Sequence, residues 1–409
     1  MKHATSLAIA VTAALTLTPQ YAHALGFRIT DVGAKGTARG GAVVATADDP
    51  SAIYNNPAGI TQLEGTNSIL GSNFIGFETS VQPKGGGATF DSNYSPQAVP
   101  HSYMTWKSKD YPIALGFGSY TPFGLALEYG DGTPFRTIGQ KGSILFNTWN
   151  PVIAWQVCDS LSIAAGATVS YSKVMLARGV AVPGDEFQFK GTGVAYGFNL
   201  GLLWQPHPKH SFGISYFSAT DMDYSGHSHL RIPSFSVATP IGEYRSAQLK
   251  NEQDADASIP YPSTLRAGYS FRPTPNWNFE VDVEWTDWDR LNSVTLHQKT
   301  GALAIPFNYE SSFFYEFGVT RKLPWDMEVS AGYIYSENSV PNESFSPLVP
   351  DSNRHVISAG FGKQFDRYDL NIAYQYAYGP HRTIAQGTAA DGVYRFESHA
   401  VSISIGYRF

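Results

Sequence analysis

Three acidic side chains alternate with apolar side chains along one short segment of the chain. These acidic residues are Glu280, Asp282 and Glu284. Because successive side chains of a β-strand point to opposite faces, a strand here would place all three carboxylates on one face. Grouped carboxylates bind cations or accept hydrogen bonds, so we expect them to hold basic side chains of another segment. The candidate basic residues near the N-terminus are Arg28, Lys35 and Arg39.

The sequence carries no recognisable arrangement of catalytic or metal-binding residues. Its 11 histidines are scattered, without a serine elbow or a histidine pair at metal-binding spacing. Cys158 is the single cysteine, so the chain has no internal disulfide and no thiol cluster for zinc. These observations predict a protein that is not an enzyme and that uses no metal and no cofactor.

The two ends of the chain predict export and insertion into a membrane. Lys2, a short apolar core and the sequence Ala22-His23-Ala24 form a secretory signal peptide over residues 1–24. The last residues, 401–409, alternate between apolar and small or polar side chains up to a terminal phenylalanine. Such a strand resembles the signal that the assembly machinery for outer-membrane barrels recognises. We therefore expect a bacterial outer-membrane location, with that machinery and outer-membrane lipid as partners.

The composition agrees with a membrane barrel. No run of about 20 apolar residues follows the signal peptide, so no spanning helix is expected. Mean hydropathy is −0.19, which suits a barrel because lipid-facing apolar residues alternate with polar lumen-facing residues. Aromatic residues make up 14% of the chain, and they favour strands and membrane interfaces. The formal net charge of −6 becomes −7 when Lys2 is removed, which argues against a nucleic-acid partner.

Alternation with a period of two recurs from about residue 67, and we assign residues 67–409 to a transmembrane barrel. Short and long connections alternate between the apparent strands. The short connections lie around 107–110, 158–160, 206–209, 273–276, 323–324 and 366–367. The long connections lie around 83–98, 123–142, 178–185, 225–254, 298–309, 337–352 and 380–393. Thirteen connections predict an all-β barrel of about fourteen antiparallel strands, an even number that leaves no exposed edge.

A soluble β-sandwich or β-propeller is the alternative fold. A propeller would show a repeat of about 40–50 residues, and the sequence shows none. Many outward tyrosine and phenylalanine side chains would also form a costly surface in water. Both observations favour the barrel.

Residues 25–66 differ from the strands that follow them. They are rich in glycine and alanine and carry charges of both signs. Asp49 followed by Pro50 predicts the start of a short helix with aspartate as its N-cap, and Pro57 predicts its end. A compact polar segment can fill the lumen of a barrel, where protein surrounds its backbone. We predict that residues 25–66 form a hatch, or plug; a flexible periplasmic tail is the alternative.

Five stretches of the chain form a recognisable series. The first runs from Gly26 through GTARGGAVVATADDPSAIYNNPAGIT. The others, in order, are YTPFGLALEYGDG, IPYPSTLRAGYSF, VEWTDWDRL and YSENSVPNESFSPLVPDSNRHVISAGFGKQF. In this order and spacing they resemble the long-chain fatty acid outer-membrane transporter family (the FadL family), and the resemblance covers nearly all of the mature chain.

The resemblance implies a fourteen-stranded barrel with an N-terminal hatch, in agreement with the independent strand count. It also implies a route. Hydrophobic substrate is captured by the extracellular loops, enters an apolar lumen and leaves sideways through a gap at a kinked third strand. The family's hatch motif at that gap corresponds to Asn56, Pro57 and Ala58. Gly59 follows here, as in relatives that transport hydrocarbons.

An apolar solute needs apolar walls along its whole route, because exposing apolar surface to water costs about 25 cal/mol per Å². The candidates for the first apolar site are Pro122, Phe123, Leu125, Leu127 and Tyr129. Packing of one loop against another is the alternative role for these residues. Trp285 and Trp288 are interpreted as part of a membrane-interface belt, and stacking on a ligand is the alternative.

A carboxylate ligand needs a cationic partner, which in the family lies on the lumen wall. The candidates here are Lys173 and Arg178, with solvated rim residues as the alternative interpretation. Glu337 corresponds to an acidic residue that the family associates with hatch control. We expect the acids Glu280, Asp282 and Glu284 to anchor the hatch.

The predicted function is passive transport of hydrophobic compounds across the outer membrane, with long-chain fatty acids as the first substrate class. Monoaromatic hydrocarbons carried by the same route are one alternative. A general diffusion porin is another, although it would need an open aqueous lumen without a hatch. An outer-membrane lipase or protease is disfavoured because no nucleophile with histidine and acid partners is recognisable. Relatives suggest a monomer.

Overall fold

The structure is a computed structural model that describes residues 26–29, 33–234, 236–239, 242–245 and 247–409. The predicted signal peptide, residues 1–24, therefore lies outside the described residues. None of the helices in the described part of the chain is long and apolar enough to span a membrane.

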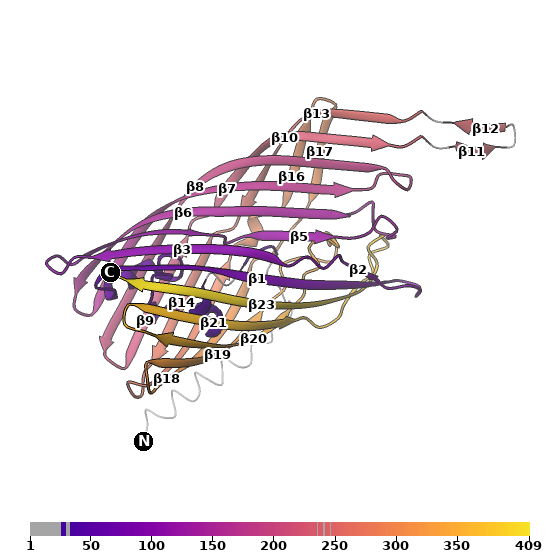
Figure 1. Ribbon diagram of the computed structural model, residues 1–409. Coiled ribbons are helices and arrows are strands. Elements are labelled where there is room, and N and C mark those ends of the chain that lie inside the picture. Colours follow the sequence, from indigo (N-terminus) through magenta and orange to yellow (C-terminus); the bar gives the residue numbers. More distant parts are fainter. Residues whose placement is uncertain (1–25, 30–32, 235, 240–241, 246) are drawn as a thin grey trace, which may run out of the picture.

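Most of the described chain forms one closed antiparallel barrel (Figure 1). The sheet closes where β1 (Gly65–Pro83) pairs with β23 (Gly392–Arg408) from one end to the other. Within the described residues the wall has fourteen transmembrane strands, some divided into two segments, so the strand number predicted from the sequence is confirmed. Between β1 and β23 their segments are β3 (Gln97–Lys107), β4 (Ile113–Tyr120), β5 (Gly124–Glu128), β6 (Lys141–Cys158), β7 (Leu161–Arg178), β8 (Glu186–His207), β9 (His210–Phe217), β10 (Thr220–Ile232), β13 (Leu249–Tyr261), β14 (Thr264–Phe271), β15 (Trp277–Thr286), β16 (Ser293–Gln298), β18 (Ser312–Leu323), β19 (Met327–Ser336), β20 (Arg354–Gln364), β21 (Tyr368–Tyr378) and β22 (Arg382–Ile384).

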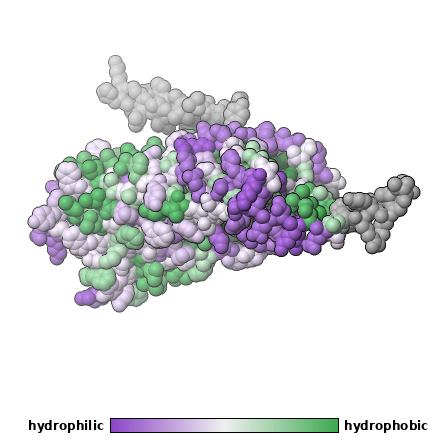
Figure 2. Space-filling model, turned by 90° about the horizontal axis from the view of Figure 1, so that it is seen from above, coloured by the Kyte–Doolittle hydropathy of each residue, from purple (hydrophilic) through white to green (hydrophobic). Residues whose placement is uncertain are grey.

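The outer face of the barrel is apolar where the strands cross the membrane. In β15 the side chains of Phe279 and Val281 are each 44% exposed on the outside, whereas Glu280 and Asp282 are buried. Apolar residues gather on the half of the molecule that carries the short turns, and hydrophilic residues cover much of the half that carries the long loops (Figure 2). Such an apolar belt is unfavourable in water and is matched by lipid.

The six short turns predicted from the sequence all lie between consecutive strands. Five predicted long loops instead contain strand. These additional segments are β2 (Phe90–Asp91), β5, the hairpin of β11 (Ser236–Thr239) and β12 (Gly242–Arg245), β17 (Gly301–Pro306), which pairs with β16, and β22. Alternation failed to predict the extended β10–β13 region because its outward residues are polar: Asp254 and Asp256, for example, are exposed. These strands continue beyond the apolar belt.

The N-terminal segment, by which we mean the described residues 26–29 and 33–63, lies inside the barrel. It contains α2 (Ala34–Ala38), α3 (Ala52–Asn55) and the 3₁₀ helix η1 (Pro57–Gln62). α2 contacts β19, β20, β21 and β23, while η1 contacts β3, β4, β6, β7 and β8. Because these strands stand on different sides of the barrel, the segment crosses the lumen.

α3 ends where the sequence predicts but starts slightly later. Asn56 is extended, with φ −157° and ψ 99°, as expected for a residue before proline. The regular helix starts at Ala52 rather than directly after Asp49. Asp49 still acts as a cap, because its side chain accepts a hydrogen bond from the backbone N–H of Ser51 at 2.8 Å.

Close contact between the N-terminal segment and the wall depends on glycine. Gly40 has a φ of +61°, and it faces the backbone of Gly332 in β19. A Cβ atom on Gly332 would overlap the backbone of Arg39 and Gly40. The absence of a side chain here lets two backbones meet, as it does at other sites of close backbone approach.

We predict that Gly332→Ala displaces the turn at Gly40, because overpacking against backbone costs about 1–3 kcal/mol. Hydrogen exchange of the amides of residues 39–42 should accelerate by about tenfold or more. Gly130→Ala is the matched control, since a Cβ atom at Gly130 would meet nothing within 4 Å. Equal exchange in the two variants would contradict the close approach.

Candidate functional site

The third transmembrane strand is interrupted between β4 and β5, at residues 121–123. Pro122 lies at the centre of the interruption and has no backbone N–H to donate to a neighbouring strand. Proline also restricts the conformation of the residue before it, Thr121. The local sequence therefore divides this strand into two segments, at the place where the family resemblance implies a kink.

The interruption leaves part of the barrel wall unpaired. Residues 102–107 of β3 pair with β4, but among the described residues no ladder joins 97–101 of β3 to β5. Beyond this region the wall closes again, where the backbone N–H of Asn93 donates to the carbonyl of Glu128 at 2.8 Å. We call the unpaired region between β3 and β5 the window.

The N-terminal segment pairs with the interrupted strand beside the window. Arg28 forms an antiparallel bridge with Phe123. The N–H of Ile29 donates to the carbonyl of Pro122 at 2.9 Å, and the N–H of Gly124 donates to the carbonyl of Phe27 at 2.9 Å. Backbone groups next to the interruption thus find partners in the N-terminal segment.

A cavity of about 460 Å³ adjoins this bridge. Its volume lies in the range of about 300–1,000 Å³ that is typical of pockets for small molecules. Apolar side chains of several strands and of the N-terminal segment contribute to its lining, among them Phe27, Phe77, Val99, Leu125, Ile144 and Val356. Leu145 also lines the cavity although it is 57% exposed on the outer face, so the cavity reaches the barrel surface near the window.

An aromatic cluster closes the cavity on the other side of the bridge. The ring of Phe123 lies 4.9 Å from that of Tyr261 and 5.2 Å from that of Phe146, centroid to centroid. Trp288 belongs to this cluster and is fully buried, so its predicted place in a membrane-interface belt is wrong. Leu127 is buried in the same cluster, whereas Leu125 lines the cavity.

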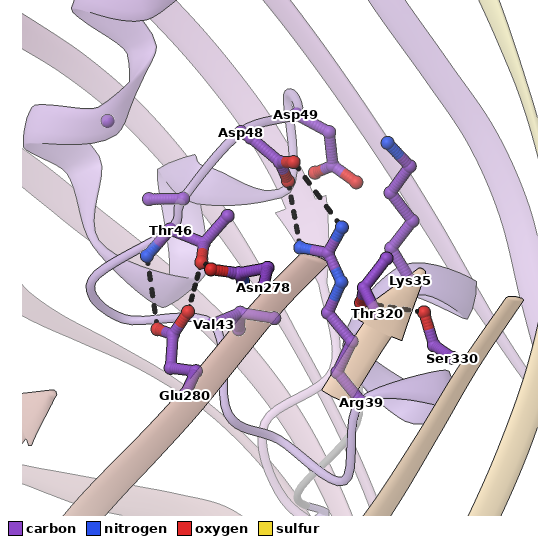
Figure 3. Close-up of polar contacts among 12 residues, drawn as sticks. Lys35, Arg39, Val43, Thr46, Asp48, Asp49, Asn278, Glu280, Thr320 and Ser330 are labelled. Carbon is purple, nitrogen blue, oxygen red and sulfur yellow. Dashed lines mark hydrogen bonds and ion pairs between the residues drawn. The ribbon is translucent and has the colours of Figure 1, made fainter. Parts of the chain in front are cut away.

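The acidic face of β15 holds the N-terminal segment through its backbone (Figure 3). Asp282 accepts hydrogen bonds from the backbone N–H groups of Val43 and Val44, each at 2.8 Å. Glu280 accepts hydrogen bonds from the backbone N–H groups of Ala45 and Thr46, at 2.7 and 3.0 Å. Four consecutive backbone N–H groups therefore find their acceptors on one strand, and these contacts anchor residues 43–46 to β15.

The third acid of this face, Glu284, pairs with two arginines. It contacts Arg28 of the N-terminal segment and accepts from Nε of Arg266 in β14 at 2.6 Å. Both guanidinium groups also donate to the hydroxyl of Tyr54, at 3.0 and 2.8 Å. The expected contact between the acidic face and Arg28 is therefore present.

Lys35 and Arg39 have other partners than the acids of β15. Arg39 pairs with Asp48 at 3.0 Å (Figure 3), and Nζ of Lys35 lies 3.6 Å from Glu328 of β19. Of the three basic candidates, Arg28 is therefore the one whose described contacts include a β15 acid, and backbone N–H groups occupy Glu280 and Asp282.

The motif Asn56, Pro57 and Ala58 lies against β8. The side-chain amide of Asn56 donates to the carbonyl of Val44 at 2.8 Å and to that of Leu202 in β8 at 2.9 Å. The motif is buried and is not part of the cavity lining. The part of the N-terminal segment that borders the cavity beside the window is instead residues 26–29.

The two predicted partners for a carboxylate lie away from the cavity lining. Lys173 is exposed on the outer face of β7. It lies two residues after Tyr171 and four after Val169, so the three side chains point to the same side of the strand. Arg178 ends β7, with its guanidinium 5.8 Å from the ring centre of Phe187.

Glu337 contacts the barrel wall at the long-loop end of β19. Its carboxylate accepts from the N–H of Phe313 at 3.1 Å and from the hydroxyl of Tyr315 at 3.2 Å. Both partners belong to β18, and neither belongs to the N-terminal segment.

The cavity contains charged residues that sequence reasoning missed. Among the described residues that line it, Arg28 and Arg354 carry charge and none is acidic. The sequence indicates Arg28 only as a partner for the β15 acids, and it gives no signal that Arg354 lines a cavity. The one sequence signal for this region is Pro122, which marks the interruption that the cavity adjoins.

We predict that Asp282→Ala frees the N-terminal segment locally, because it leaves the N–H groups of Val43 and Val44 unpaired. Each unpaired buried N–H costs about 1–3 kcal/mol. Hydrogen exchange of these two amides should accelerate by at least about tenfold. Asp256→Ala on the outer face of β13 is the control, and slow exchange in both variants would refute the anchor.

The protein-family model described as "Outer membrane protein transport protein (OMPP1/FadL/TodX)" matches residues 15–409. The chain is 22% identical to the long-chain fatty acid transport protein of Escherichia coli O6:H1, covering 99% of this chain and 98% of that one. It is 21% identical to outer membrane protein P1 of Haemophilus influenzae, with coverage of 97% and 98%.

Solved structures share the fold. A FadL homologue from Pseudomonas aeruginosa superposes with a TM-score of 0.82 at 17% identity, covering 94% of this chain and all of that one. The CymD monoaromatic hydrocarbon channel superposes with a TM-score of 0.72 at 20% identity, with coverage of 94% and 99%. Because the family model spans nearly the whole chain, the protein belongs to the OMPP1/FadL/TodX family of outer-membrane transport proteins, whose members are transporters and not enzymes.

Proposed function

We propose that this protein carries hydrophobic molecules passively through the outer membrane by way of the cavity and the window. The observation that supports this route most strongly is an apolar cavity that adjoins an unpaired stretch of the barrel wall. A molecule in the cavity can reach the bilayer between β3 and β5 without crossing a layer of water.

The physical advantage of a lateral route is continuous apolar contact. Exposing apolar surface to water costs about 25 cal/mol per Å², which is a large barrier for a long alkyl chain. The cavity lining includes Leu125 on the lumen side and Leu145 on the outer side, so apolar side chains accompany the solute through the wall.

We further propose that residues 25–66 act as the hatch of this route. The carboxylates of Glu280 and Asp282 anchor its middle, and the bridge between Arg28 and Phe123 borders the window. Asn56, Pro57 and Ala58 serve as the fixed base of the hatch, because Asn56 joins Val44 to β8. Glu337 contacts β18 and not the N-terminal segment, so we give it no role in opening the hatch.

Long-chain fatty acids are the first proposed substrate class, as for the relative named a long-chain fatty acid transport protein. Monoaromatic hydrocarbons are the alternative, since the CymD and TodX channels share the fold. A general diffusion porin is disfavoured, because the N-terminal segment occupies the lumen that a porin would keep open. Large steady single-channel conductance steps would favour the porin.

The first test measures uptake of labelled oleate and toluene by cells that lack a transporter of this kind. Cells with the intact protein should take up at least one of them. Ala126→Trp fills the cavity lining and should reduce that uptake several-fold. Ala302→Trp on the exposed β17 is the control and should have no effect. No uptake by the intact protein, folded in the outer membrane, would refute the proposed function.

A second test addresses the hatch. Pro57→Ala removes the restriction that proline places on Asn56, so the clamp between Val44 and β8 should loosen. We expect several-fold lower uptake of the transported substrate at unchanged protein level. Pro306→Ala, at the end of β17, controls for the loss of a proline. If both variants transport like the intact protein, the hatch role of the motif fails.

A further inference from the structure

Two lysine side chains face outward on neighbouring strands of the wall, on the long-loop side of the apolar belt. Lys173 of β7 and Lys190 of β8 are both exposed. Lys173 is opposite Thr192 in the register of these strands, and Thr192 lies two residues from Lys190. The two lysines are therefore diagonal neighbours, at a separation of about 7–8 Å.

The position of the lysines along the strands places them at the outer boundary of the lipid core. β7 begins at Leu161 on the short-turn side, and a strand tilted across a bilayer needs about 9–11 residues. The membrane span of β7 therefore ends near Tyr171, and Lys173 is the next residue that points outward. Lys190 is opposite Met175, so it lies one outward position further from the membrane core.

The outer surface next to the lysines, on the membrane side, is apolar and aromatic. Val194 and Tyr196 are exposed on the same face of β8 as Lys190, and Leu145 is exposed on β6 directly opposite Lys173. Lipid acyl chains match such a surface, and aromatic side chains gather at the boundary between lipid core and headgroups. A lipid that packs here has its headgroup at the level of the two lysines.

Neither Lys173 nor Lys190 has an acidic residue opposite it among the described strands. The residues opposite the two lysines are apolar, neutral or histidine: Leu145, Thr192, Met175 and His227. Asp254 follows His227 in the same row of the sheet. Its carboxylate already lies 3.2 Å from Nδ1 of His227 and 3.0 Å from Nζ of Lys299. The two lysines therefore form a positive site without a counter-charge from the wall.

Two like charges on adjacent strands repel each other, and this repulsion favours an anion between them. A phosphate group carries the charge and the several oxygen atoms that two ammonium groups need as acceptors. The long lysine stems can lie along the apolar wall while their ammonium groups reach the headgroup region. Clustered basic residues at this level attract anionic headgroups.

We propose that Lys173 and Lys190 bind the phosphorylated headgroup of a lipid in the outer leaflet, whose acyl chains lie on the adjoining apolar wall. This inference goes beyond the proposed transport function and does not depend on it. The competing interpretation is that both lysines are solvated residues of the barrel rim that bind no lipid.

The test uses the full-length protein in detergent at low salt and measures bound lipid by native mass spectrometry. The probe is lipid A, a glycolipid with phosphate groups, and the matched probe is lipid A without its phosphates. The variant is Lys173→Met combined with Lys190→Met, which removes both charges and keeps unbranched side chains. Lys109→Met combined with Lys209→Met is the control, because these exposed lysines lie on short turns at the other end of the barrel. Resistance of the barrel to SDS without heating verifies folding.

We expect the intact protein and the control to bind lipid A about tenfold or more tightly than the probe without phosphates. The double methionine variant should lose most of this preference, whereas Lys173→Arg combined with Lys190→Arg should keep it because the charges remain. Inorganic phosphate at the same concentration should not displace lipid A, since it lacks acyl chains. Equal binding of both probes by the intact protein, an equal loss in the control, or displacement by inorganic phosphate would overturn the assignment.

Discussion

A chain that crosses a bilayer must pair its backbone polar groups within the protein, and the site depends on how this chain meets that demand at Pro122. A proline in a wall strand removes a donor and interrupts the ladder. The neighbouring groups are not left unpaired: the carbonyl of Pro122 accepts from Ile29, and the N–H of Gly124 donates to Phe27. The interruption and the adjoining end of the N-terminal segment are therefore parts of one arrangement. Without the segment the third strand would lose these partners, and without the interruption the segment would have no bridge to form.

Several acidic and basic side chains are buried inside the barrel, and their partners determine how they are tolerated there. Glu280 and Asp282 accept hydrogen bonds from four backbone N–H groups rather than from cations. Glu284 is shared by Arg28 and Arg266, and Arg39 pairs with Asp48. Each of these three arginines thus has an acidic partner, which is the condition under which ionic groups are tolerated inside proteins. These contacts hold the middle of the N-terminal segment. Its first described residues are held by the bridge to Phe123, by Asp351 and by the ion pair between Arg28 and Glu284.

The relatives share this architecture at low identity. Structures that are 17–20% identical superpose over more than nine-tenths of this chain. A barrel tolerates such divergence because its wall needs alternation and paired backbone rather than particular side chains.

The sequence by itself determined the class of fold, the number of strands and the positions of the short turns, because alternation and turn residues are local signals. Alternation along β7 also contained the information that Lys173 faces outward, since it follows Val169 and Tyr171 in steps of two. Where polar outward residues break the pattern, as in β13, local signals failed. Only the tertiary structure decided which lumen residues meet. Gly26 reaches Asp351, and Ala45 reaches Glu280, across 325 and 235 positions of the chain. Such contacts arise from closure of the barrel around the N-terminal segment, and no periodicity within a strand encodes which inward side chain will face which part of that segment.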